Sequence, residues 1–483
     1  MRRNWQSLNG EWDFTFLDIN RPKCKIQVPF VYQCERSGVN EQEISEHVEY
    51  TRTFTVPANW QGQEILLHFG AVDYYCEIYV NGKYCGNHTG GSAPFHFNIT
   101  PHLTGGEETV TVRVHDPLED ETIPRGKQFW EAIPHAIWYT QTTGIWQSVW
   151  LEPVHKTRLT ELRFTPDVDS GSVQIEYEIS GLMNGLTLHT DIEFDGQLFY
   201  SGSNTITDTY QSFSVNLYGR RIFRSTAHQA GLCWSPERPN LFDVKLRLTQ
   251  DGQEVDNVTS YFGMRKIECR GDRIYLKNHA YYQRLVLDQG YWKESLLTAP
   301  DDDAFKTDIL MAKELGFNGC RKHQKAEDPR ADKLGFLVWG EVPSAPSYSA
   351  KTVERLTNEW FEIIRKDLST LDNLLAIRFS DQPVFAEGYG YNGEPVMLTE
   401  FGGIAFNKNQ SEGGWGYTFI ADEEDYISTY RRLLTDIYDS ACLWGFCYTQ
   451  LTDVQQEMNG MLTEDRQFKC DPQIIREINN GWN

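Results

Sequence analysis

One glutamate, Glu400, follows a short apolar run and precedes two glycines in the segment VMLTEFGG (396–403). An apolar run without alternation is typical of a parallel strand that is buried on both faces. In (β/α) barrels the catalytic side chains lie at the carboxyl ends of such strands. A carboxylate held there can attack an anomeric carbon and later leave it, as a nucleophile of glycosyl transfer does. The structural alternative is a helix cap or an ion-pair partner at a strand-to-loop corner.

The elements around Glu400 alternate between strands and helices from Phe262 onwards, which indicates a parallel sheet. Helices are expected at 301–315, 351–368 and 422–440, because apolar residues recur there at helical spacing. Strands are expected at 282–288, 317–321, 336–341, 374–379, 396–400 and 443–448. Residues 263–483 are therefore predicted to form a (β/α)8-type barrel, with Glu400 at its catalytic end.

The predicted barrel lacks two strands and is shorter than the roughly 250 residues typical of the fold. The shortfall lies between the strands at 374–379 and 396–400, where the connection SDQPVFAEGYGYNGEP has too many Gly and Pro residues for a helix. Parallel crossovers need about a dozen residues and usually a helix. We therefore expect an incomplete or irregular barrel between residues 380 and 396. The GxGxxG match in GYGYNG (388–393) precedes a strand, so it does not indicate dinucleotide binding.

Two strand-rich segments precede the barrel. Residues 1–153 alternate short β-rich runs with turn residues, which predicts a jelly-roll-like β-sandwich with a tight hairpin at Asn81-Gly82. Residues 154–262 repeat the pattern on a smaller scale, which predicts an immunoglobulin-like sandwich. Between Asp116 and Gln147 the alternation lapses into a long aromatic and charged loop, and loops of that length usually have a function.

The composition narrows the class of partner. Lys and Arg number 45 against 68 Asp and Glu, so the net charge of −23 disfavours nucleic acids and anionic membranes and favours a neutral substrate. No run reaches the roughly 18 apolar residues of a membrane span, and we expect a cytoplasmic protein. The ten Cys show no CxxC spacing, so reduced core residues are expected rather than disulfides or zinc ligands.

Seven segments together resemble one known family. They are LNGEWDF (8–14), YVNGKYCGNHTGGSAPFHFNIT (79–100), TTGIWQSVWLE (142–152), FGMRKIE (262–268), FNGCRKHQKAEDPR (317–330), VWGEVPS (338–344) and LTEFGG (398–403). With the order of sandwich, immunoglobulin-like sandwich and barrel, they make the chain similar to glycoside hydrolase family 2, the β-galactosidase and β-glucuronidase family. The resemblance implies that residues 1–153 form a sugar-binding-like β-sandwich.

The resemblance assigns roles to individual residues. Glu400 resembles the catalytic nucleophile of a retaining enzyme, and Arg321 resembles the arginine beside it, which would keep the carboxylate ionised and aimed. Residues that would contact the sugar are Glu341, Asp288, Tyr448 as an aromatic floor, and Asp116, Lys127 and Gln128 in the long loop. Each of these could equally be an ordinary ion pair or packing group. The resemblance implies a carbohydrate substrate and no cofactor or metal, and it leaves room for a homo-oligomer.

One departure from the family concerns the general acid/base, a Glu that follows an Asn at the end of the fourth strand. Asn40-Glu41 lies in the first sandwich and Asn358-Glu359 in a predicted helix, whereas the fourth strand runs AIRFSDQP. An internal deletion of about two βα units would explain the loss. Asp381 is the first candidate for a substitute acid, followed by Glu387 and Glu341. The sequence therefore predicts either an impaired retaining glycosidase or a non-catalytic carbohydrate-binding relative.

Overall fold

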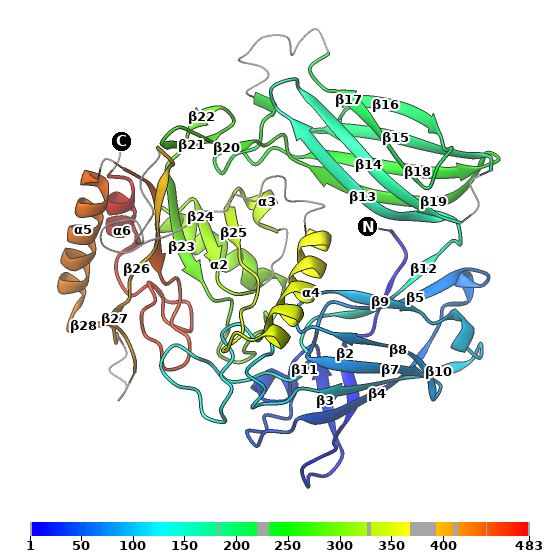
Figure 1. The fold of residues 1–483 in the computed structure, drawn as a ribbon, viewed down its shortest axis with the longest axis horizontal. Coiled ribbons are helices and arrows are strands. Elements are labelled where there is room, and N and C mark those ends of the chain that lie inside the picture. The colour runs from blue at the N-terminus through cyan, green and yellow to red at the C-terminus, as the bar shows by residue number, and fades with distance from the viewer. Residues whose placement is uncertain are drawn as a thin grey trace.

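The computed structural model describes residues 2–181, 184–219, 231–325, 330–367, 393–408, 414–440 and 442–481. In these ranges the strands gather into three groups, which follow one another along the colour scale of Figure 1. Each group encloses a hydrophobic core of its own. The protein is thus multidomain and rich in strands, while the division at residues 153 and 262 stays a prediction.

The first group is a sandwich of two antiparallel sheets. One sheet has the order β1 (Gln6–Ser7), β12 (Val149–Val154), β5 (Glu64–Phe69) and β9 (Phe95–Asn98). The other has the order β3 (Cys24–Val28), β2 (Gly10–Phe16), β4 (His47–Thr55), β10 (Glu107–His115), β7 (Tyr75–Val80) and β8 (Lys83–Thr89). Alternate residues of these strands are buried, as in β7, because one face of each sheet covers the shared core.

Shorter elements complete this sandwich. They are the paired strands β6 (Val72–Asp73) and β11 (Gly144–Ile145) and the 3-10 turns Glu35–Ser37, Ala58–Trp60 and Thr100–His102. The predicted hairpin at Asn81-Gly82 is confirmed, because both residues have positive φ, 52° and 72°, between β7 and β8.

The second group is a smaller pair of antiparallel sheets. One has the order β13 (Arg158–Asp167), β14 (Ser172–Ser180) and β17 (Tyr210–Asn216). The other has the order β16 (Gln197–Thr205), β15 (Leu186–Phe194), β18 (Phe242–Gln250) and β19 (Gln253–Phe262). Phe164, Val173 and Phe242 belong to a core that both sheets share, so this group also is a sandwich.

The third group is built on a five-stranded parallel sheet. Its order is β25 (Leu337–Gly340), β24 (Gly319–Lys322), β23 (Gln283–Asp288), β29 (Leu443–Thr449) and β26 (Val396–Gly402). The accompanying helices are α2 (Asp302–Glu314), α3 (Arg330–Leu334), α4 (Ala350–Asp367), α5 (Glu423–Asp439) and α6 (Pro472–Asn479). Small strands flank the sheet: β20 (Ile267–Arg270), β21 (Arg273–Leu276), β22 (His279–Ala280), β27 (Ile404–Phe406) and β28 (Thr418–Ile420). No helix in the described ranges is long and apolar enough to cross a membrane.

Five of the six predicted barrel strands and all three predicted helices are confirmed. The strand expected at 374–379 lies outside the described residues, as does most of the segment from 380 to 396. The described strands form an arc that ends at β25 and β26, so a closed barrel is not confirmed. The predicted irregularity of this region stays a prediction.

Helix α4 packs against the first sandwich and the long loop. Glu359 of α4 is 2% exposed and accepts a hydrogen bond from the backbone nitrogen of Ser92 at 3.0 Å. Glu362 of α4 lies 3.1 Å from Nε2 of His88 in β8, and Arg355 donates to Asp120 of the loop at 2.8 Å. The Asn358-Glu359 pair is thus part of a contact between the sandwich and the parallel-sheet group.

Burial and the nearby Asp73 carboxylate raise the pKa of Glu359 to about 8. The folded chain therefore keeps a proton that the unfolded chain releases near its ordinary pKa of 4.5. This contribution to stability is full below pH 4.5 and is lost as the pH rises towards 8.

We predict that Glu359→Gln, which imitates the protonated carboxyl, makes the melting temperature less sensitive to pH between about 5 and 9. Each kcal/mol that the wild type loses over this range should lower its melting temperature by roughly 2–4 °C. Differential scanning fluorimetry across pH measures the effect, and Glu354→Gln on the exposed side of α4 is the matched control. Identical pH profiles for the wild type and Glu359→Gln would contradict this account.

Candidate active site

Arg321 joins two carboxylates that come from different strands of the parallel sheet. Its Nε donates to Glu341 Oε1 at 2.6 Å, and its Nη1 donates to Glu400 Oε2 at 2.9 Å. Nη1 also donates to the backbone oxygen of Thr399 at 2.9 Å. Arg321 lies in β24, Glu341 directly follows β25 and Glu400 lies in β26, so the ends of three strands supply the cluster.

This contact requires a strongly curved sheet. Strands β23 and β29 lie between β24 and β26, which would place the outer two roughly 14 Å apart in a flat sheet. Nevertheless Arg321 reaches the backbone oxygen of Thr399. The arc must therefore curl so that Arg321 and Glu400 face each other across its concave side, as side chains do inside a barrel.

The charges of the cluster act on Arg321. Burial opposes the charge on Arg321, but Glu341, with smaller contributions from Cys447 and Glu400, outweighs it and raises the pKa of the guanidinium. The guanidinium therefore stays charged and donates a charge-assisted hydrogen bond to Glu400. The Glu400 side chain is 41% exposed, so a ligand can reach it, whereas that of Arg321 is 15% exposed.

Glu341 and Asp288 are both engaged with the protein. Besides Arg321, Glu341 accepts a hydrogen bond from the backbone nitrogen of Gln324 at 3.2 Å. Asp288, at the end of β23, accepts one from Lys322 Nζ at 2.7 Å and another from the backbone nitrogen of Gly290 at 2.8 Å. These partners, with Lys322 foremost, lower the pKa of Asp288 against the effect of burial. Asp288 therefore acts as the anion of a buried ion pair.

The long loop of the first sandwich reaches this site. No strand interrupts it between β10 and β11, and in Figure 1 it (cyan) lies beside the loops that follow the parallel strands. Gln455 Nε2 donates to Thr140 Oγ1 at 2.9 Å, and Gln456 Nε2 donates to the backbone oxygen of Trp138 at 2.9 Å. The loop therefore lies against the segment that follows β29, at the carboxyl ends of the parallel strands.

Lys127 is the loop residue whose charge acts on Glu400. Its side chain is buried, and its Nζ lies 5.2 Å from the ring centroid of Trp138. Burial lowers the pKa of Lys127, while the negative charges of Glu457 and Glu400 oppose this effect. Lys127 therefore stays a candidate for substrate contact.

The other two loop candidates do not face the Glu400 cluster. Asp116 accepts hydrogen bonds from Gln141 Nε2 at 2.9 Å and Thr143 Oγ1 at 2.8 Å. Gln128 donates to Asp73 at 2.7 Å, and its Oε1 accepts from the backbone nitrogen of Thr142 at 2.6 Å. Both side chains are buried and satisfied by the loop or the sandwich, so the structure gives them a structural role and corrects the expectation of sugar contact.

The expected aromatic floor at Tyr448 is also corrected. Tyr448 is 0% exposed, and its hydroxyl lies 2.7 Å from that of Tyr426 in α5. Its ring packs edge-on against Phe401 and Tyr430. A side chain enclosed in this way offers no face to a sugar, because it points from β29 into the core between sheet and helix.

Glu457 is a site residue that the sequence analysis missed. It follows β29, is 3% exposed, and accepts hydrogen bonds from Tyr139 Oη at 2.5 Å and Asn459 Nδ2 at 3.1 Å. Burial raises the pKa of Glu457, and the negative charge of Glu400 adds to the effect. No motif marks this residue in the sequence, and its partner Tyr139 belongs to another group of strands.

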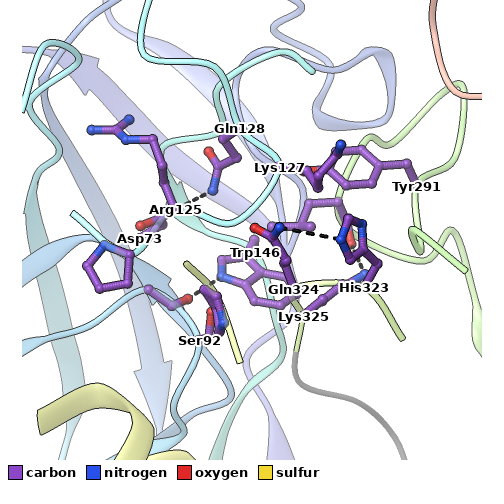
Figure 2. Close-up of a pocket in the computed structure, with 14 residues that line it drawn as sticks. Asp73, Ser92, Arg125, Lys127, Gln128, Trp146, Tyr291, His323, Gln324 and Lys325 are labelled. Atoms are coloured by element: carbon purple, nitrogen blue, oxygen red, sulfur yellow. Dashed lines mark hydrogen bonds between the residues drawn. The ribbon is translucent and has the colours of Figure 1, made fainter. Parts of the chain in front are cut away.

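A small polar cavity lies where the sandwich meets the parallel-sheet group (Figure 2). The sandwich side supplies Asp73, Ser92, Arg125, Lys127, Gln128 and Trp146, and the other side supplies Tyr291, His323, Gln324 and Lys325. Its volume of about 20 Å³ suffices for one water molecule and is far too small for a sugar ring. The cavity is thus a feature of the interface, and Glu400 lies outside its lining with a side chain that is open to solvent.

Asp381 and Glu387, the first two candidates for the acid/base, lie outside the described residues. The described carboxylates that act on Glu400 or share its arginine are Glu341 and Glu457. The site as described therefore has a carboxylate suited to nucleophilic attack and a bound guanidinium beside it.

Comparison with known proteins agrees with this arrangement. Residues 26–152 match the family model for the sugar-binding domain of glycosyl hydrolases family 2, and residues 157–265 match a second model, glycosyl hydrolases family 2. A β-galactosidase of Thermoanaerobacter pseudethanolicus is 27% identical over 406 residues, which is 80% of this chain and 51% of that protein. A putative β-glucuronidase of Formosa agariphila is 26% identical over 285 residues, covering 57% of this chain and 32% of the relative.

A solved structure shows the same fold. That of Bifidobacterium dentium β-glucuronidase has a TM-score of 0.78 and 19% identity, covering 99% of this chain and 97% of that one. The two chains therefore share one fold. Residues 26–152 and 157–265 thus match glycoside hydrolase family 2, and the chain spans about half or less of the length of the two curated relatives named above.

We predict that Glu457→Ala loosens the long loop, because it leaves the buried Tyr139 hydroxyl without its acceptor. Loss of such a buried partner costs roughly 1–3 kcal/mol, which corresponds to a rise in local opening of about 5- to 160-fold. Hydrogen–deuterium exchange of peptides within 124–142 measures the change, and Glu424→Ala on the exposed face of α5 is the control. Unchanged exchange in the loop would show that this hydrogen bond does not hold it.

Proposed function

We propose that the protein hydrolyses the glycosidic bonds of terminal β-linked sugars with retention of configuration, and that Glu400 is the nucleophile. The observation that carries this proposal is the hydrogen bond from Arg321 to Glu400 at the end of a parallel strand, with the carboxylate 41% exposed. The curated relatives named above are a β-galactosidase and a putative β-glucuronidase, which supports a β-glycoside as substrate.

The chemistry follows from the geometry around Glu400. A nucleophilic carboxylate must be ionised and must point at the anomeric carbon. Arg321 serves both needs, since it favours the charged form and holds one oxygen of Glu400 by a hydrogen bond. Glu341 in turn accepts a hydrogen bond from Nε of Arg321, which keeps the guanidinium oriented towards Glu400.

Retention also needs an acid/base carboxyl about 5 Å from the nucleophile. For this role we propose Asp381, which follows the expected fourth strand within two residues, with Glu387 as the next candidate. Glu341 is less suited, because Arg321 and the backbone of Gln324 already occupy its oxygens. An internal deletion of about two βα units accounts for the absence of the family's Asn-Glu pair.

We predict weak turnover of natural disaccharides and faster turnover of dinitrophenyl glycosides. A lost or poorly placed acid costs about 10²- to 10⁴-fold, and the cost is smallest for leaving groups that need no protonation. Initial rates on lactose, an aryl β-glucuronide and the matching dinitrophenyl glycosides measure the difference. Azide should accelerate turnover of the dinitrophenyl glycosides, because it replaces the water that the acid/base would activate.

Variants of the candidate catalytic residues control this experiment. Glu400→Gln should abolish turnover of both kinds of substrate while leaving the melting temperature within a few degrees of the wild type. Robust hydrolysis of the disaccharide that survives both Asp381→Ala and Glu387→Ala would show that the acid is elsewhere, and Glu457→Gln would then be tested. Sugar binding without any turnover would overturn the proposal in favour of a non-catalytic carbohydrate-binding protein.

A further inference from the structure

Two histidines lie side by side on the outer face of the first sandwich, away from its core. His47 begins β4 and His115 ends β10, and the two residues are directly opposite each other in the antiparallel pairing of these strands. Their rings are stacked, with centroids 4.2 Å apart and an angle of 3° between the planes. His47 is exposed and His115 is half-buried, so both rings can be reached from solvent.

Neither imidazole has a hydrogen-bond partner among the described residues. Within the described residues, neither a hydrogen bond nor an ion pair involves a ring nitrogen of His47 or His115. Neighbouring charges act on His115 only through space. Side-chain nitrogens of histidine normally find a partner or remain available to solvent and ligands. The antiparallel pairing of β4 and β10 therefore holds two imidazoles side by side, with ring nitrogens that could bind a ligand.

A carboxylate completes the group. One ligand atom from each of Glu46, His47 and His115 can be chosen so that all three lie within 4.8 Å of one another. Glu46 Oε1 accepts a hydrogen bond from the backbone nitrogen of Leu118 at 2.9 Å, which fixes its side chain and leaves Oε2 for a ligand.

The backbone around this group is held in place by Asp18. Its Oδ2 accepts hydrogen bonds from the backbone nitrogens of Glu46 at 2.8 Å and His47 at 3.0 Å, and its Oδ1 accepts from the Ser45 hydroxyl. The backbone nitrogen of Asp116 donates to the oxygen of Glu46 at 2.9 Å, which ties the segment to the residue after His115. The ligand-bearing segments are therefore ordered by contacts that do not use the ligand atoms.

We propose that Glu46, His47 and His115 bind a divalent transition-metal ion, with zinc as the first candidate. Two imidazoles and one carboxylate are a ligand set that suits Zn²⁺, Co²⁺, Ni²⁺ or Cu²⁺, whereas Mg²⁺ and Ca²⁺ prefer oxygen ligands alone. Water would fill the remaining position, as it does in three-ligand zinc sites.

The ligand atoms of Glu46, His47 and His115, which lie within 4.8 Å of one another, must move closer together to bind one ion. Zinc–nitrogen bonds of about 2.0–2.1 Å place neighbouring tetrahedral ligands roughly 3.3 Å apart. Rotation about the side-chain bonds of His47 and His115 can provide this approach, because no hydrogen bond from the described part of the chain holds either ring. The net charge of −23 and the Asp18 carboxylate beside the group favour a bound cation.

The site lies at the base of the long loop and is separate from the Glu400 cluster. His115 directly precedes Asp116, the first residue of that loop. A metal bound here would join β4 to β10 at the point where the loop leaves the sandwich. This inference does not depend on the proposed glycosidase activity.

Isothermal titration of the full chain with ZnCl₂, after removal of metal with a chelator, tests the proposal. We expect one equivalent to bind, at least tenfold weaker binding in Glu46→Gln, and loss of that equivalent in both His47→Ala and His115→Ala. His279→Ala is the matched control, since it removes an exposed histidine from β22 and should change nothing. Circular dichroism of the metal-free proteins checks that every variant is folded.

Cobalt distinguishes this site from the free thiols, of which Cys269 is exposed. Bound Co²⁺ should show the visible bands of nitrogen and oxygen ligation without a thiolate charge-transfer band. The same stoichiometry and affinity in the wild type and in a folded His47→Ala variant would overturn the proposal, as would a thiolate band for the tight equivalent.

Discussion

The hydrogen bonds of Arg321 to Glu341 and Glu400 are the interaction on which the rest of the site depends. They connect the ends of β24, β25 and β26, and the last of these is separated from β24 by two further strands. Only a curled sheet can satisfy them. The contact of the arginine thus needs the parallel sheet to be curved, and the arginine in turn holds the Glu400 carboxylate in one orientation.

The first sandwich contributes to this site through one loop. Tyr139 and Lys127 approach Glu457, which follows β29, and α4 closes the contact between the two groups of strands with Glu359. Several buried carboxyls lie along this contact, and burial raises the pKa of Glu359, Glu457 and Asp73. The contact between the sandwich and the site therefore contains carboxyl groups whose pKa values are raised by burial.

Much of the fold follows from patterns that are local in the sequence. Alternating strands, the positive-φ turn at Asn81-Gly82 and the amphipathic spacing of α2 each report on residues close together in the chain. The approach of Arg321 to Glu400 was also predictable, because carboxyl ends of parallel strands share one edge of a sheet.

Other features depend on which way one side chain points or on pairings between distant segments. Successive residues of a strand point to opposite faces of the sheet. A shift of one position therefore decides whether an aromatic side chain lies in the site or in the core, and Tyr448 lies in the core. The contact of Tyr139 with Glu457 and the pairing of His47 with His115 join residues far apart in the sequence. Neither pairing has a motif, since each is set by the register and packing of elements that only the folded chain brings together.

The most direct test of the central claim is covalent trapping of the nucleophile. The protein would be incubated with dinitrophenyl 2-deoxy-2-fluoro-β-glycosides of galactose and of glucuronic acid, digested, and examined by mass spectrometry. The account predicts a glycosyl ester on Glu400, because the good leaving group allows attack while the fluorine slows hydrolysis of the intermediate. A label on Glu341, Glu457 or another carboxylate, or turnover of ordinary dinitrophenyl glycosides without any trapped ester, would contradict it.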